Sequence, residues 1–255
     1  TMMSLKKSIP KIKSSTEPFY NSRIIKDEKE IQILKKASKI IDEMFDICSK
    51  TMKVGQKESE LQTILMVYAM EQQMFDTGYK STLNPLIIAG GPNGALPHAQ
   101  VSQRKFKKGD LVVTDLTLRY KGYVSDATRT FAVGKISTQV NEAYEIVKES
   151  QKLGLKAVKP NANCKDVDSA CRKYIEENNY GQYFIHSTGH GIGLEVHELP
   201  TVSYQSEIKL KENMAITVEP GIYIKNKFGI RIEDSLIVRN QPIVMHKFTK
   251  DLVTI

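Results

Sequence analysis

Residues 115–131, DLTLRYKGYVSDATRTF, predict a β-hairpin with one aspartate on each strand. A turn centred on residues 120–121 would bring Asp115 and Asp126 opposite each other, with both side chains on one face. Asp115 follows the apolar run at 111–113, which is typical of a core strand, and burying an unpaired carboxylate is costly. Because two facing carboxylates repel each other unless a cation lies between them, the hairpin predicts a metal site.

A second acidic pair occurs in EPGIYIKNKFGIRIED, residues 219–234. Glu219 and Glu233 lie on either side of a predicted turn near Asn226, and Glu219 follows the apolar run at 214–218. Isolated acids are common on surface strands, so each acid taken alone is also compatible with an exposed position. Four acids on two hairpins favour a metal site over that alternative.

Three of the five histidines lie in HSTGHGIGLEVHELP, residues 186–200. A single histidine is more often a core or surface residue than a ligand. Here Gly189 and Gly191 flank His190 and leave its imidazole clear of bulky neighbours, while Gly193 permits a close backbone approach. His190 is therefore the candidate metal ligand of this stretch.

The elements around these motifs occur in an order that repeats. Asp27 and Glu30 form a capping pair for a helix that ends near Gly55. Periodicity predicts the remaining elements, namely helices at about 58–73, 138–158 and 165–178 and strands at 85–89, 111–115 and 123–133, with further strands to the end of the chain. Helix, helix and hairpin in two copies indicate two similar halves packed as one α/β (α+β) unit.

Composition describes an ordinary globular protein, with 40% hydrophobic and 26% charged residues in a chain of 255. The net charge of +8 is spread along the chain and accompanies no nucleic-acid-binding motif, so we do not expect nucleic-acid binding. No apolar run is long enough to span a bilayer, and we expect a cytoplasmic protein without a membrane partner. The three cysteines are expected to be free, buried thiols.

Five segments together carry a family resemblance. NGALPHA around His98, the 115–131 hairpin, the 186–200 stretch, VEPGIY and GIRIED resemble, in this order, the signature regions of the metal-dependent peptidases with the pita-bread fold. These are methionine aminopeptidase, aminopeptidase P and prolidase, and the resemblance covers residues 24–255. It implies a pita-bread catalytic domain at 26–255 whose metal ligands are Asp115, Asp126, His190, Glu219 and Glu233.

The resemblance also implies a mechanism. Two divalent ions are expected per chain, with Mn²⁺ or Co²⁺ preferred to Fe²⁺ or Zn²⁺. They would hold a bridging hydroxide that attacks the scissile carbonyl of a small peptide, and Glu219 would act as proton shuttle. His98 and His197 would act in catalysis by stabilising the oxyanion, and substrate binding would involve His98, His186, His197 and Arg231. Family members of this kind suggest a homodimer.

Details of the motifs favour the proline-directed branch. His186, the run SDATRT at 125–130 and Arg231 resemble prolidase and aminopeptidase P, which implies hydrolysis of Xaa-Pro bonds in dipeptides or short peptides. Thr117 departs from that branch, where glycine is usual. The alternatives are methionine aminopeptidase and a non-catalytic pita-bread binding module. Residues 1–25 are expected to be a linker or the remnant of an N-terminal domain, which members of this branch usually carry.

Overall fold

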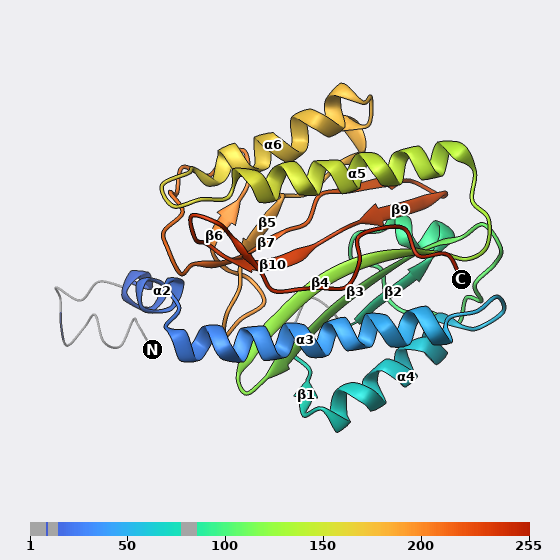
Figure 1. Ribbon diagram of the computed structural model, residues 1–255, viewed down its shortest axis with the longest axis horizontal. Coiled ribbons are helices and arrows are strands. Elements are labelled where there is room, and N and C mark those ends of the chain that lie inside the picture. Colours follow the sequence, from blue (N-terminus) through green and yellow to red (C-terminus); the bar gives the residue numbers. More distant parts are fainter. Residues whose placement is uncertain (1–8, 10–14, 78–85) are drawn as a thin grey trace.

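The computed structural model describes residue 9, residues 15–77 and residues 86–255. Helices α3 and α4 lie on one side of the strands, and α5 and α6 lie on the other (Figure 1). The helical elements are α2 (Glu17–Ile24), α3 (Glu28–Thr51), α4 (Glu58–Glu71), η1 (Gly91–Ala95), α5 (Thr138–Ala157), α6 (Cys164–Glu177) and η2 (Gly181–Tyr183). The predicted α/β class with two helix pairs is confirmed.

The strands form two larger sheets and a separate hairpin. Their bounds are β1 (Met74–Phe75), β2 (Leu86–Gly90), β3 (Leu111–Tyr120), β4 (Tyr123–Ala132), β5 (Gly189–Gly191), β6 (Glu198–Val202), β7 (Ala215–Val218), β8 (Gly221–Ile224), β9 (Phe228–Arg231), β10 (Asp234–Ile237) and β11 (Ile243–Val244). In the first half, β3 pairs antiparallel with β4, β2 and β1. In the second half the order is β11-β10-β7-β5-β6, and β8 pairs with β9. Pro85 of the predicted 85–89 strand lies outside the described residues.

Helix α3 begins where its capping pair predicts. The Asp27 carboxylate accepts hydrogen bonds from the backbone N–H groups of Lys29 and Glu30 at 2.8 and 2.9 Å, and the Glu30 carboxylate accepts one from Asp27 N at 2.6 Å. The helix ends at Thr51, four residues before Gly55, which has a φ of +84°. Its buried face packs on β3 and β4, so this helix supports the hairpin that carries the two aspartates.

The β3–β4 hairpin has a different register from the predicted one. Lys121 and Gly122 form the two-residue turn, with φ values of +47° and +89° that are typical of a type I′ turn. Asp126 therefore pairs with Thr117, and Asp115 pairs with Thr128. The prediction that the aspartates face each other directly is wrong by two residues. Because side chains alternate with a period of two, both aspartates still lie on one face of the hairpin, as predicted.

In the second acidic pair, Glu219 lies opposite Glu233, as predicted. The ladders β7–β10 and β8–β9 share one continuous register, and Glu219 and Glu233 occupy the gap between them. The turn between β8 and β9 contains Asn226, whose φ of +62° suits an asparagine. This hairpin therefore holds the two glutamates opposite each other where β7 ends and β10 begins.

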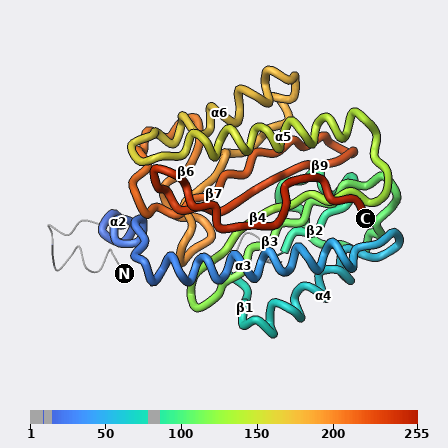
Figure 2. Tube along the Cα trace, viewed as in Figure 1, coloured from blue at the N-terminus to red at the C-terminus, as the bar shows by residue number. Residues whose placement is uncertain are grey.

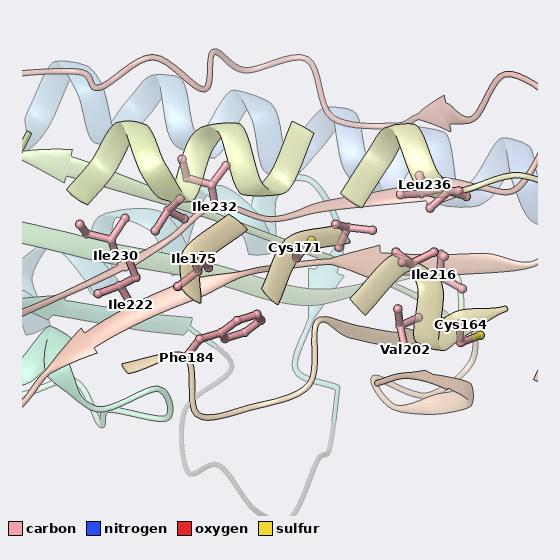
Figure 3. Packing of buried hydrophobic residues seen from close by; sticks show 14 of the residues in the cluster. Cys164, Cys171, Ile175, Phe184, Val202, Ile216, Ile222, Ile230, Ile232 and Leu236 are labelled. Atoms are coloured by element: carbon pink, nitrogen blue, oxygen red, sulfur yellow. The ribbon is translucent and has the colours of Figure 1, made fainter. Parts of the chain in front are cut away.

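Each half has its own apolar core. In the second half, apolar residues of α5 and α6 pack against strands β7 to β10, and Figure 3 shows Cys164 and Cys171 among them. Cys48 is buried in the core of the first half. All three thiols are free and buried, as predicted, and burial raises the pKa of Cys171 to about 12 and that of Cys164 to about 11. They are therefore structural residues with little thiolate character.

The C-terminal residues tie the halves together. Figure 2 follows them back along β4, where Thr254 bridges to Ala132. The buried Arg129 donates hydrogen bonds to Glu233 O at 2.6 Å, to Asp234 Oδ1 at 2.8 Å and to Phe248 O at 3.0 Å. The Arg129 guanidinium thus links β4 to the start of β10 and to the C-terminal segment.

The segment 1–25, expected to be a linker or remnant, contains helix α2 at Glu17–Ile24. Residues 1–8 and 10–14 of this segment lie outside the described residues. After α2, Ile25 forms an isolated bridge with Met214, and Lys26 N donates to Asn213 O at 2.9 Å. The end of α2 is therefore attached to the second half. Within the described part of the chain, no helix is both long and apolar enough to cross a membrane.

Candidate metal centre and substrate pocket

The acidic residues of both halves converge on His190. Ligand atoms of Asp126, His190 and Glu233 all lie within 4.8 Å of one another. His190 Nε2 is 3.4 Å from Glu219 Oε1 and 3.8 Å from Asp126 Oδ2. Strand β4 of the first half and strands β5, β7 and β10 of the second half thus bring these four side chains to one point.

Asp115 joins this cluster through Thr117. The Thr117 hydroxyl lies 2.7 Å from Asp126 Oδ1 and 3.2 Å from Asp115 Oδ1. The other Asp115 oxygen, Oδ2, accepts a hydrogen bond from Arg231 Nη2 at 2.6 Å. The threonine that departs from the expected glycine therefore lies between the two aspartates.

The carboxyl groups of this cluster are hard to ionise together. Burial and then the charges of Asp115 and Glu219 raise the pKa of Asp126 well above its ordinary value. Burial and the same kind of repulsion raise the pKa of Glu233. Burial raises the pKa of Glu219 to about 8, although Arg231 opposes the shift. Divalent cations would relieve this repulsion, and four carboxylates with one imidazole suit Mn²⁺, Co²⁺ or Fe²⁺.

His190 has the hydrogen bonding of a metal ligand. Burial and the neighbouring His197 lower its pKa to about 3, so the ring is neutral. Its Nδ1 lies 3.0 Å from Gly191 O, and a nitrogen that faces a carbonyl oxygen must carry the proton. The lone pair is therefore on Nε2, the atom that faces Asp126 and Glu219.

A cavity of about 490 Å³ opens over the acidic cluster. Its lining includes the remaining predicted site residues, His98, His186, His197 and Arg231. His98 and His197 are exposed, and the His197 ring meets the His190 ring edge-on at 4.3 Å between centroids. The structure thus brings all nine predicted site positions to one pocket: Asp115, Asp126, His190, Glu219, Glu233, His98, His186, His197 and Arg231.

Tyr223 and Thr128 support this pocket, although the sequence did not single them out. His186 Nδ1 lies 2.8 Å from Ser187 O and must donate to it, so Nε2 accepts a hydrogen bond from the Tyr223 hydroxyl at 2.9 Å. Burial, with Arg231 nearby, lowers the pKa of His186 to about 3 and keeps the ring neutral. The Tyr223 oxygen in turn accepts from Arg231 Nη1 at 2.6 Å.

Thr128 joins the two halves directly beside the acids. Its hydroxyl donates to Glu233 Oε2 at 2.7 Å and accepts from Arg231 Nε at 3.0 Å. Both supporting residues lie inside segments already noted as motifs, VEPGIY and SDATRT. Their position inside these motifs was the signal in the sequence that could have pointed to Tyr223 and Thr128.

Comparisons with known proteins agree with this geometry. The model of metallopeptidase family M24 matches residues 32–240. The Xaa-Pro dipeptidase of Pyrococcus horikoshii is 42% identical over 253 residues, which cover 97% of this chain and 70% of that protein. The Xaa-Pro dipeptidase of Pyrococcus furiosus is 41% identical over 91% of this chain, and the match spans 66% of its length.

Solved structures show the same architecture. The Xaa-Pro dipeptidase of Bacillus anthracis superposes with a TM-score of 0.88 at 40% identity, covering 95% of this chain and 67% of that one. The X-Pro aminopeptidase of Thermotoga maritima gives a TM-score of 0.91 at 33% identity, covering 100% of this chain and 71% of that one. With the family model matching most of its length and a converging set of metal-binding side chains, this chain belongs to metallopeptidase family M24, whose prolidase-like members share its pita-bread fold.

Proposed function

We propose that this chain hydrolyses Xaa-Pro bonds in dipeptides or short peptides with the help of two divalent metal ions. The observation that carries the proposal is that four buried or half-buried carboxylates and a neutral imidazole line one pocket. The similarity to two Xaa-Pro dipeptidases at 41–42% identity supports the choice of substrate.

Five side chains would hold the metal ions: Asp115, Asp126, His190, Glu219 and Glu233. Ions bound there supply an activated water nucleophile and polarise the scissile carbonyl. The donor set favours Mn²⁺ or Co²⁺, with Fe²⁺ or Zn²⁺ as alternatives.

Glu219 is the proposed proton carrier. Its carboxylate lines the cavity, 3.4 Å from His190 Nε2, where it can accept a proton from a water bound in the pocket. The leaving nitrogen of a peptide bond must receive a proton as the bond breaks, and in an Xaa-Pro bond this nitrogen belongs to a tertiary amide without a hydrogen of its own. A carboxyl group that first takes a proton from water and then donates it performs that transfer.

The histidines around the pocket complete the proposed site. His98 and His197 are exposed to the cavity and would stabilise the oxyanion that forms on the carbonyl. His186 and Arg231 also line the cavity, where they would bind substrate. Tyr223 hydrogen-bonds to both and holds them in place.

Chelation tests the metal requirement. Exhaustive chelation should abolish peptidase activity, and Mn²⁺ or Co²⁺ should restore it. Elemental analysis must confirm that the chelated protein is free of metal. Full activity of such a protein would contradict the proposal.

A competition assay tests substrate choice. Metal-loaded protein is incubated with Met-Pro, Ala-Pro-Ala and Met-Ala-Ser at equal concentrations. Cleavage of the two proline peptides is expected, and a preference for Met-Pro would assign a dipeptidase while a preference for Ala-Pro-Ala would assign an aminopeptidase. Release of methionine from Met-Ala-Ser as the main product would favour methionine aminopeptidase. Absence of cleavage of all three peptides by protein with two metals per chain would contradict the proposed peptidase function.

The remaining assignments are also proposals. Buried, free Cys48, Cys164 and Cys171 suit a reducing compartment, so we propose a cytoplasmic enzyme. We propose residues 26–255 as the catalytic unit with residues 1–25 as a connecting segment, and a homodimer on the basis of the family resemblance. Analytical ultracentrifugation of the protein tests the dimer directly.

A further inference from the structure

Helix α2 forms part of the wall of the substrate pocket. Tyr20, in the middle of this helix, lines the same cavity as the acidic cluster and is 41% exposed. Its neighbour Phe19 is 72% exposed and does not line the cavity. An aromatic side chain from the N-terminal segment therefore faces the place where a peptide would bind.

Helix α2 is held at the pocket by a charged contact. The Glu198 carboxylate, whose side chain is only 5% exposed, accepts hydrogen bonds from Arg23 Nε at 3.1 Å and from Lys26 Nζ at 3.0 Å. The Arg23 Nη2 group also contacts this carboxylate. Glu198 directly follows His197 in the chain, so the contact ties α2 to the segment that carries a proposed catalytic residue.

The contact is costly to break because Glu198 is buried, with only 5% of its side chain exposed, whereas Arg23 is 30% exposed. Moving α2 away would leave this buried carboxylate without Arg23, one of its two cationic partners. Tyr20 lies one helical turn before Arg23, so fixing Arg23 also fixes the position of Tyr20. The Tyr20 ring is therefore held at the cavity before substrate binds.

The surroundings of Tyr20 suit an apolar part of a peptide. Val196 and Leu199 line the cavity beside Glu198, and α2 contacts β6, the strand that contains Leu199. Histidines and Arg231 line other parts of the same cavity. A tyrosine ring offers a large apolar area and loses little side-chain entropy when it binds.

We propose that Tyr20 contacts the peptide substrate and contributes to its binding through its ring. The inference rests on the proposed Xaa-Pro peptidase function and adds to it a residue from outside the family's signature segments. Tyr20 would contribute equally in the ground state and the transition state, because it packs on a part of the substrate that does not react.

The test compares three variants of the metal-loaded protein with Leu-Pro and Gly-Pro as substrates. Tyr20→Ala should raise KM about tenfold for at least Leu-Pro and change kcat less than twofold, as expected when uniform binding is lost. Tyr20→Phe keeps the ring and should retain the original KM within about twofold. Phe19→Ala, on the same helix but outside the cavity, is the matched control and should leave both constants unchanged.

The outcomes separate the inference from the proposed function. A larger KM rise for Leu-Pro than for Gly-Pro places the ring on the first residue's side chain, and an equal rise places it on proline; both support the inference. An unchanged KM for Tyr20→Ala, an equal rise for Phe19→Ala, or the same loss for Tyr20→Phe would overturn it.

If the unaltered protein cleaves neither dipeptide, the proposed function fails. Calorimetric titration with Leu-Pro then decides the inference: weaker binding by Tyr20→Ala supports it, while equal or absent binding contradicts it.

Discussion

His190 and His197 lie in contact but differ in how their rings are held. His190 is buried, and its Nδ1 donates to the backbone, which directs Nε2 to the carboxylates. His197 is exposed to the cavity, and burial of part of its ring together with the nearby His98 lowers its pKa. The first geometry suits a metal ligand, and the second suits a neutral group that contacts substrate.

This difference predicts the behaviour of His197→Ala. Because His197 is not among the side chains that surround the proposed ions, the variant should keep two metals per chain and lose about 100-fold or more in kcat, as expected for a transition-state donor. Metal content is measured by elemental analysis and kcat with Met-Pro. Loss of metal from the variant would instead identify His197 as a ligand.

The turn between β3 and β4 sets the position of both aspartates. A two-residue type I′ turn at Lys121 and Gly122 moves the pairing two residues away from the one that a turn at 120–121 would produce. This register places Thr117 opposite Asp126, where its hydroxyl contacts both aspartates. A local turn thus determines the hydrogen bonding of the proposed metal ligands.

Gly122→Ala isolates the contribution of this turn. A Cβ at Gly122 would meet no atom within 4 Å, so the cost comes only from the φ of +89° and is expected to be about 1–2 kcal/mol. Urea denaturation measures the loss of unfolding free energy. Lys121→Asn is the control, because asparagine tolerates a φ of +47°, and its stability should be unchanged or slightly higher. Equal losses in both variants would contradict the turn assignment.

Helix α2 depends on Arg23 for its place at the pocket. Arg23→Gln should weaken the contact with Glu198 and raise KM for Leu-Pro a few-fold, in the same direction as Tyr20→Ala, because Tyr20 would lose its fixed position. Steady-state kinetics measures the effect. Arg239→Gln is the control, since Arg239 likewise forms ion pairs, with Glu28 and Glu212, but does not line the cavity. A similar KM rise in the control would show that the effect is not specific to α2.

The proposed metal centre lies where the two halves meet, so metal binding there would be coupled to the stability of the fold. Thr128 and Arg129 of β4 form hydrogen bonds to Glu233 and Asp234 of the second half. Burial alone would raise the pKa of Asp234, but Arg129 and Lys250 hold it well below its ordinary value, so this ion pair stays charged. Within residues 15–77 and 86–255, Arg231 is the cation that opposes the raised pKa values of Asp126 and Glu233, and it does not balance the neighbouring acidic cluster.

Stability of the metal-free protein should therefore fall as pH rises. The pKa of Glu219 is raised from 4.5 to about 8, so its contribution favours the folded state fully below about pH 4.5 and is lost as pH rises through 8. Asp126 and Glu233 shift in the same direction. Between pH 6 and 8 the loss from one such group is about 2 kcal/mol, and Mn²⁺ should remove it.

Thermal unfolding, monitored by circular dichroism, checks this expectation. The rise in Tm on adding Mn²⁺ should be larger at pH 8 than at pH 6 by about 4–8 °C. Asp126→Asn is the control, because it removes one repelling charge, and its metal-free form should depend less on pH than the unaltered protein. A Tm rise that is equal at both pH values would contradict the repulsion described above.

Much of the fold and the candidate site followed from local patterns in the chain. The Asp27–Glu30 cap, the apolar stripe of α3 and the alternation of the hairpins act over a few residues, so they are readable without a structure. Family motifs predicted nine site positions, all of which the structure brings to one pocket. Sequence patterns therefore predicted the helices, the strands and the types of side chain proposed to bind metal.

One turn without a clear sequence signal and several contacts between distant residues decided the rest. The register of β3 and β4 depends on which two residues adopt positive φ, and Lys121 gives no strong signal for that conformation. Arg23 lies 175 residues from Glu198 in the chain, and no periodicity in residues 1–25 indicates that the two meet. Tyr223 acquires its role only when His186 and Arg231 approach it from other segments. Local preferences act over one or two turns of chain, whereas the contacts of Arg23 and Tyr223 form only when the whole core has packed.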